Sequence, residues 1–213
     1  MYQPEKTMKT IERPFVLLLA VLFSCLFISA SGAQETVLQE QDMPFYVYYD
    51  TGSSRNHFYP SGWMGDWGEI KFNDDCRTGF HGGHSCIRVT YFAKGFNGAG
   101  WVGIYWQDPL KNWGTVEGGY NLGKARRLSF YARGERGGEV ISEFKVGGIT
   151  GDYPDSGTAS IGPVVLTDQW QQYTIDLSDT ELSHISGGFC WSTSRDANSG
   201  QPITFFLDDI RYE

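Results

Sequence analysis

Short runs in which apolar and polar residues alternate fill most of the chain from Met43 onward, and no stretch sustains the period of a helix. Successive side chains of a strand point to opposite faces of its sheet, so this alternation predicts β-strands. Gly, Asn, Asp and Pro separate the runs, as expected for turns between strands. The predicted strands are 45–50, 69–72, 86–92, 101–106, 127–133, 140–146, 171–177, 188–193 and 203–212.

The same alternation predicts which side chains enter a core. Along 127–133 the apolar row is Leu128, Phe130 and Ala132, and the opposite row is Arg127, Ser129, Tyr131 and Arg133. Along 140–146 the apolar row is Val140, Phe144 and Val146, opposite Ile141, Glu143 and Lys145, while Tyr173, Ile175 and Leu177 share one side of 171–177. Two antiparallel sheets packed face to face bury all of these rows, so we predict an all-β fold, a two-sheet antiparallel β-sandwich.

One connection is predicted in more detail. Residues 134–138 read Gly-Glu-Arg-Gly-Gly and supply glycines for the positive φ angles of a tight turn. We therefore expect a hairpin in which strands 127–133 and 140–146 are neighbours. In that hairpin Tyr131, Arg133, Glu143 and Lys145 share one face turned away from the core.

The N-terminal 33 residues have the layout of a secretory signal. Lys6, Lys9 and Arg13 precede an apolar run over 15–30, which is short for a membrane span of roughly 20 residues. Small residues follow at 31–33, so we predict cleavage after Ala33, with an uncleaved N-terminal anchor as the alternative. The rest of the chain divides into a linker, 34–42, and a single domain, 43–213, and we expect a secreted or periplasmic protein.

Composition and net charge exclude some classes of binding partner. The formal charge of the whole chain is −8. Basic residues outnumber acidic ones in the predicted signal, so the chain that remains after cleavage is slightly more acidic. An acidic domain without a basic stripe argues against nucleic acid and against an anionic membrane surface. The 27 glycines suit many tight connections, and the aromatic content of 15% argues against disorder.

Three cysteines follow the predicted signal, which itself contains Cys25. In an oxidising compartment two of them should pair. We predict a disulfide between Cys76 and Cys86, which bracket a Gly-rich segment, and a buried apolar role for Cys190 beside Phe189 and Trp191. Zinc is the alternative, because His81 and His84 lie between the two cysteines, but the spacing matches no known finger.

Segments of the C-terminal half carry a family resemblance. They are Thr167-Asp168-Gln169-Trp170-Gln171-Gln172-Tyr173-Thr174-Ile175-Asp176-Leu177, Gly187-Gly188-Phe189 and Phe205-Phe206-Leu207-Asp208-Asp209-Ile210. They resemble the closing strands of galactose-binding-like jelly rolls, a group that includes many carbohydrate-binding modules, and the resemblance extends more loosely over 119–148. It implies a jelly-roll sandwich and suggests a carbohydrate ligand, although this fold also carries other functions.

The resemblance also implies a structural calcium ion where the first and last strands meet. Carried onto this sequence, its ligands are Asp50 and Asp208, with oxygens from Asp75 or its neighbour Asp74. Whether Asp208 or Asp209 is the final-strand ligand stays open. Acidic residues near a Gly-rich loop suit a cation that takes six to eight oxygens, but the same acids can simply cap turns.

Seven tryptophans follow the signal, more than a core of this size needs. Sugar rings pack their C–H faces on flat aromatic side chains, beside polar groups that bond the hydroxyls. Because Trp101 and Tyr105 share one side of 101–106, we predict a ligand site made of Trp101, Tyr105, Tyr131, Arg133, Glu143 and Lys145. The plain alternative is a solvated, salt-bridged strand face. Trp63, Trp67 and Trp113 lie in Gly-rich segments and either rim a cleft or plug the ends of the sandwich.

These features favour an exported, non-catalytic carbohydrate-binding protein. A glycan-active enzyme needs two carboxyl groups across a cleft, and Glu143 with Glu117 or Asp152 is the available pair, whose separation the sequence does not give. No nucleophile elbow, phosphate loop or dinucleotide fingerprint is present in the sequence, so we do not predict an enzyme. The remaining alternative is a cell-envelope domain whose aromatic face meets another protein.

Overall fold

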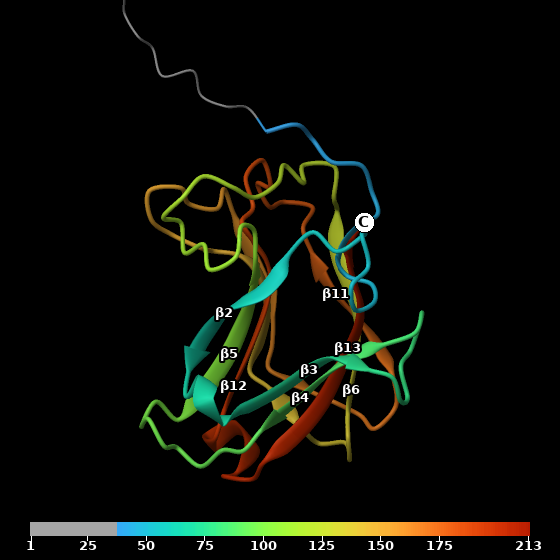
Figure 1. Ribbon diagram of the computed structural model, residues 1–213, viewed down its shortest axis with the longest axis vertical. Coiled ribbons are helices and arrows are strands. Elements are labelled where there is room, and N and C mark those ends of the chain that lie inside the picture. Colours follow the sequence, from blue (N-terminus) through green and yellow to red (C-terminus); the bar gives the residue numbers. More distant parts are fainter. Residues whose placement is uncertain (1–37) are drawn as a thin grey trace, which may run out of the picture. The chain divides into compact units, whose positions relative to one another are not determined.

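The computed structural model describes residues 38–213, so the predicted signal, 1–33, lies outside the described residues. The described chain is built from short strands and two single-turn 3-10 helices (Figure 1). The strands are β1 Phe45–Tyr48, β2 Tyr59–Gly65, β3 Ile70–Cys76, β4 Cys86–Tyr91, β5 Trp101–Gln107, β6 Arg127–Gly134, β7 Val140–Ile141, β8 Glu143–Gly147, β9 Thr158–Ile161, β10 Val164–Val165, β11 Gln171–Asp176, β12 Gly187–Ser194 and β13 Ile203–Tyr212. The 3-10 helices are η1 Trp67–Glu69 and η2 Asp196–Asn198.

Two antiparallel sheets face each other, which confirms the predicted β-sandwich (Figure 1). The six-stranded sheet has the order β11-β6-β13-β4-β3, and β1 also pairs with β13. The five-stranded sheet has the order β2-β5-β12-β8-β9, while β7 and β10 pair separately. Within residues 38–213, helices long and apolar enough to cross a membrane are absent.

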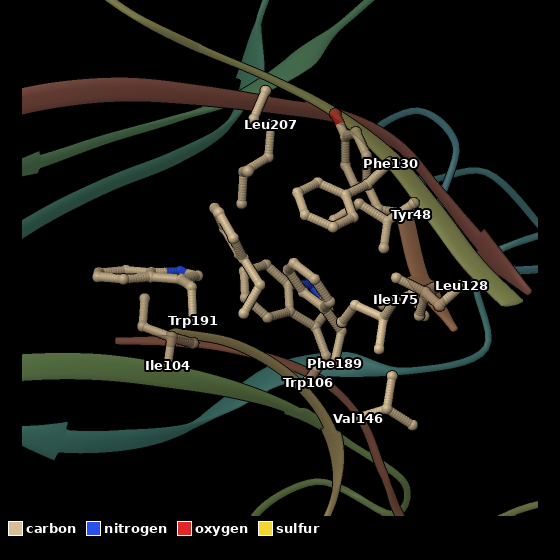
Figure 2. Close-up of a cluster of buried hydrophobic side chains, with 14 of the residues drawn as sticks. Tyr48, Ile104, Trp106, Leu128, Phe130, Val146, Ile175, Phe189, Trp191 and Leu207 are labelled. Carbon is tan, nitrogen blue, oxygen red and sulfur yellow. The ribbon is translucent and has the colours of Figure 1, made fainter. Parts of the chain in front are cut away.

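The core lies between the sheets and is rich in large rings (Figure 2). Phe130 of β6 faces Phe144 and Phe189 of the other sheet at centroid distances of 4.6 and 5.3 Å. Trp191, which lies beside Cys190, is fully buried. The predicted core positions that the structure confirms are Leu128, Phe130, Ala132, Phe144, Val146, Ile175 and Leu177.

The predicted hairpin at 134–138 is wrong. β6 pairs with β11 and β13 in the six-stranded sheet, whereas β8 pairs with β12 and β9 in the five-stranded sheet. The connection therefore crosses from one sheet to the other. The predicted strand 140–146 is also interrupted at Ser142, so Ile141 is buried in the core instead of facing outward.

Three strands were not predicted: β2, β9 and β10. β2 reads Tyr-Pro-Ser-Gly-Trp-Met-Gly, and its proline and glycines conceal the alternation. A proline is acceptable in this strand because β2 is the edge of its sheet and pairs only with β5. The missed strand matters, because β2 supplies one border of the candidate site.

We expect Phe189→Ala to lower the free energy of unfolding by about 3–5 kcal/mol, because it leaves a cavity among packed rings. Phe189 contacts Trp106, Phe130 and Phe144, all in the core. Urea denaturation followed by tryptophan fluorescence measures the change. Tyr153→Ala, at an exposed position, is the control and should change stability by less than about 0.5 kcal/mol. Equal effects of the two substitutions would contradict this packing.

Candidate functional site

The outward side of the five-stranded sheet, here called the outer face, carries several of the predicted ligand residues. Directly paired residues of antiparallel strands point to the same side. Ile104, Trp191 and Phe144 are paired in one row and all face the core. The rows on either side of it therefore face outward: they are Met64, Gly103, Ser192 and Glu143, and Gly62, Tyr105, Cys190, Lys145 and Ser160. Trp101 and Ser194 form the next outward pair.

Trp101, Tyr105, Glu143 and Lys145 thus lie on one face, as predicted. Gly103 lies between the outward side chains of Trp101 and Tyr105. A Cβ on Gly103 would lie 2.7 Å from Cε of Met64 and 2.8 Å from the Trp191 carbonyl oxygen. The absence of a side chain at Gly103 therefore leaves room for the Met64 side chain on this part of the outer face.

Tyr131 and Arg133 lie elsewhere, so the predicted single surface is wrong. Both residues belong to β6 and pair with Asp208 and Phe206 of β13 on the outward side of the six-stranded sheet. The ring of His81 stacks on Tyr131 at 3.5 Å, and the Arg133 guanidinium lies 3.9 Å from the Phe206 ring centroid. Alternation identifies an outward row, but it does not say which of the two sheets carries that row.

Tyr105 is only 6% exposed and does not form an open platform. Its hydroxyl donates to the Gly147 carbonyl at 3.0 Å, and its ring packs with Ile149 and Cys190. The ring of Trp113 meets Tyr105 edge-on at 5.8 Å. Tyr105 therefore supports the loops at this end of the face, while the exposed Trp101 lies at the other end.

A pocket of about 740 Å³ opens at the β2 edge of the five-stranded sheet. We call it the tryptophan pocket; its lining is Ser61, Trp63, Trp67, Gly68, Ile70, Lys111 and Trp113. All three indoles are exposed, and Trp67 is 57% exposed. Of the two alternatives from the sequence, the structure supports the cleft rim for these tryptophans. The pocket and the outer face meet at Trp113, which lines the first and contacts Tyr105 on the second.

Hydrogen bonds fix the loop that carries Trp113. The Asn112 side-chain oxygen accepts from the backbone N–H groups of Gly114 and Thr115 at 3.0 and 3.1 Å. Gln107 Nε2 donates to the Asn112 carbonyl at 2.8 Å. The Lys111 N–H donates to Ser61 Oγ at 2.8 Å, and Ser61 Oγ donates to Gln107 Oε1 at 2.9 Å. This network ties the loop to β2 and β5, so Trp113 is positioned before any ligand arrives.

The acids predicted to hold calcium contact backbone donors instead. Asp50 Oδ1 accepts from the N–H groups of His84 and Ser85 at 2.7 and 2.8 Å. Asp208 Oδ2 accepts from the N–H groups of His81 and Gly82 at 2.8 and 3.1 Å. Burial raises the pKa of Asp208 to about 7, against these hydrogen bonds, which lower it.

Asp75 does not join the other two acids, because it is exposed and pairs with Arg77 at 2.8 Å. Among residues 38–213, no three His, Cys, Asp or Glu side chains are grouped so that they could hold a metal ion. Calcium takes six to eight oxygens, some of them from backbone carbonyls, so carboxylates alone would not complete its ligand set. The calcium ion stays a prediction, and the visible role of Asp50 and Asp208 is to hold the backbone of the 81–85 loop.

The predicted disulfide is not formed. Cys76 and Cys86 are register partners on β3 and β4, yet both are free thiols, as is the buried Cys190. The Cys86 thiol donates to the Cys76 carbonyl at 3.5 Å, and the Cys76 thiol donates to the Thr78 carbonyl at 3.7 Å. Each thiol thus points to a backbone acceptor. Among the described residues, no group of His, Cys, Asp and Glu side chains could hold the zinc ion of the alternative prediction. The ring of His81 stacks on Tyr131 instead.

Solved structures share this fold. The family 30 carbohydrate-binding module of a cellulosomal cellulase of Clostridium thermocellum superposes with a TM-score of 0.54 at 18% identity, covering 81% of this chain and 98% of the module. A second family 30 carbohydrate-binding module gives a TM-score of 0.53 at 20% identity, covering 78% of this chain and 96% of that one. No family model and no curated protein matches the chain. At these identities the similarity establishes the jelly-roll fold of carbohydrate-binding modules, as the sequence resemblance predicted.

We expect Asp208→Ala to lower the melting temperature in the presence of a chelator, because the backbone N–H groups of His81 and Gly82 lose their acceptor. A typical hydrogen bond contributes about 0.5–1.5 kcal/mol, so the loss should be detectable by calorimetry. Asp75→Ala, at the exposed predicted ligand, is the control and should leave the melting temperature nearly unchanged. A loss confined to calcium-containing buffer would show instead that Asp208 acts through a metal.

Proposed function

We propose that this protein is an exported, non-catalytic carbohydrate-binding protein that holds a polysaccharide or oligosaccharide in the tryptophan pocket and on the adjoining outer face. The observation that carries the proposal is the group of three exposed indoles around one pocket. Exposed aromatic clusters of this kind are rare on soluble proteins without a binding role. Sugar rings present flat C–H faces that pack on indoles, so the lining suits them.

Polar groups lie beside the indoles and on the outer face. Lys111 and Ser61 line the pocket beside the indoles. On the outer face, Glu143 is paired with Ser192, and Lys145 lies in the neighbouring row. A carboxylate accepts hydrogen bonds from sugar hydroxyls, an ammonium group donates to them, and a serine hydroxyl does both. The face is therefore mixed in its polarity, as carbohydrate recognition requires.

The fold and the sequence support the same proposal. Solved structures that share this fold with TM-scores above 0.5 include carbohydrate-binding modules of family 30. The predicted signal, 1–33, supports export, and the net charge of −8 disfavours nucleic acid as the ligand. Glu117 and Asp152, the carboxylates considered as partners for Glu143 in hydrolysis, are exposed residues outside the strands.

We expect Trp63→Ala and Trp113→Ala each to weaken binding to the preferred polysaccharide by roughly thirtyfold, the usual effect of removing a central aromatic contact. Glu143→Ala should weaken it by a smaller factor through lost hydrogen bonds to sugar hydroxyls. Affinity gel electrophoresis on a panel of soluble polysaccharides, followed by isothermal titration calorimetry, measures these effects.

Arg133→Ala is the matched control, since Arg133 lies on the outward side of the other sheet, and its affinity should equal that of the wild type. If Arg133→Ala abolishes binding while Trp63→Ala and Trp113→Ala do not, the site belongs on the six-stranded sheet. If no polysaccharide retards the wild type, the protein is not a carbohydrate-binding protein and a protein partner becomes the better explanation.

A further inference from the structure

The segment 92–101, which is the connection between β4 and β5 together with the first residue of β5, carries a set of exposed rings. We call it the aromatic loop. Phe92 and Trp101 are exposed, and Phe96 is 75% exposed. The Lys94 ammonium lies 5.5 Å from the Phe92 centroid and 5.4 Å from the Phe96 centroid, within cation–π distance of both rings. A loop that serves only as a connection gains nothing from presenting these side chains to solvent.

Two buried carboxylates hold the backbone of the aromatic loop. Glu69, at 2% exposure, accepts from the N–H groups of Lys94 and Phe96 at 2.5 and 2.6 Å. Asp66, fully buried, accepts from the N–H groups of Ala99 and Gly100 at 3.0 and 2.8 Å. Burying a carboxylate is unfavourable unless its oxygens are hydrogen-bonded, and here each oxygen takes one backbone donor. The loop is therefore held in one conformation.

The same two acids connect the aromatic loop to the tryptophan pocket. Asp66 and Glu69 flank Trp67 and Gly68, both of which line that pocket. The backbone at Asp66 lies close to the backbone at Trp101, because the Asp66 N–H donates to the Trp101 carbonyl at 2.9 Å. A Cβ on Gly65, which has φ +63°, would lie 2.1 Å from that carbonyl oxygen. A single turn thus presents Trp67 to the pocket and its carboxylates to the loop, so the two surfaces adjoin.

We propose that the aromatic loop is a second contact site for the same carbohydrate chain, so that this protein binds internal stretches of a linear polysaccharide and not single sugars or chain ends. The inference rests on the proposed function. A chain that leaves the tryptophan pocket past Trp67 would meet Phe92 and Phe96, whose exposed rings stand on a backbone that Glu69 holds. Glu69 and Asp66 are positioning residues for this contact.

The chemistry favours an uncharged chain. The Lys94 ammonium is already held over two rings, and the protein carries a net charge of −8, which repels polyanions. Phenyl rings bind sugars through their apolar C–H faces without requiring charge on the sugar. The loop therefore suits a neutral, linear polysaccharide.

The test compares ligand length in two variants. Soluble β-glucan, xylan and galactomannan, with polygalacturonate as the anionic polymer, identify the polymer that binds most tightly to the wild-type protein. Oligosaccharides of that polymer, from disaccharide to octasaccharide, are then titrated by calorimetry into wild type, Phe96→Ala and Val165→Ala. Val165 is an exposed apolar residue outside both the loop and the pocket lining, which makes it the matched control. Thermal melts verify that each variant is folded.

The wild type should gain affinity with length, and Phe96→Ala should lose about tenfold for the longest chain while keeping the disaccharide affinity. Val165→Ala should match the wild type throughout. If Phe96→Ala equals the wild type at every length, the aromatic loop is not a contact site, although the tryptophan pocket still binds sugar. If polygalacturonate binds best, the neutral-chain assignment is overturned. If the wild type binds no polymer, the proposed function fails and this inference with it.

Discussion

Backbone N–H groups in the long loops depend on buried carboxylates for their hydrogen bonds, and the shape of the exposed surface follows from this constraint. Asp66 and Glu69 hold the 92–101 loop, and Asp50 and Asp208 hold the 81–85 loop. Asp155 does the same for Ser186, whose N–H it accepts at 2.6 Å. Glycine-rich loops bury little apolar surface of their own. Without these carboxylate acceptors the loops would therefore sample many conformations. The hydrogen bonds to each carboxylate therefore order a loop that hydrophobic packing alone does not order.

This constraint also makes the two outward surfaces different. On the six-stranded sheet, the 81–85 loop is drawn down by Asp50 and Asp208, and His81 covers Tyr131 while Arg133 packs on Phe206. On the five-stranded sheet, the held loops lie toward the two ends of β5 and leave Trp101, Glu143 and Lys145 at least partly accessible. The outward side of the five-stranded sheet therefore keeps the exposed ring of Trp101 together with the half-buried charged groups of Glu143 and Lys145.

Sequence patterning predicted the strands and most of the core correctly, because burial of one row per strand is a local, period-two property. It failed wherever sheet assignment mattered: the turn at 134–138 has the composition of a hairpin, yet it crosses between the sheets. β2 was missed because Pro60 and Gly62 interrupt its pattern. Asp50 and Asp208 were predicted to be calcium ligands, which stays a prediction, and the sequence could not show that backbone N–H groups donate to their carboxylates.

In the candidate site, too, the features visible in short stretches of sequence could be predicted, whereas the contacts between residues far apart in the sequence could not. The exposed tryptophans are recognisable from their number and their Gly-rich surroundings, but the contact that gathers them is distant in sequence, since Ser61 bonds the Lys111 backbone. Such a bond fixes Trp113 beside Trp63 only after β2 has joined the edge of β5. The tryptophan pocket is therefore a product of edge-strand formation: any change that frees β2 from β5 would separate Trp63 from Trp113 while leaving most of the core rows packed.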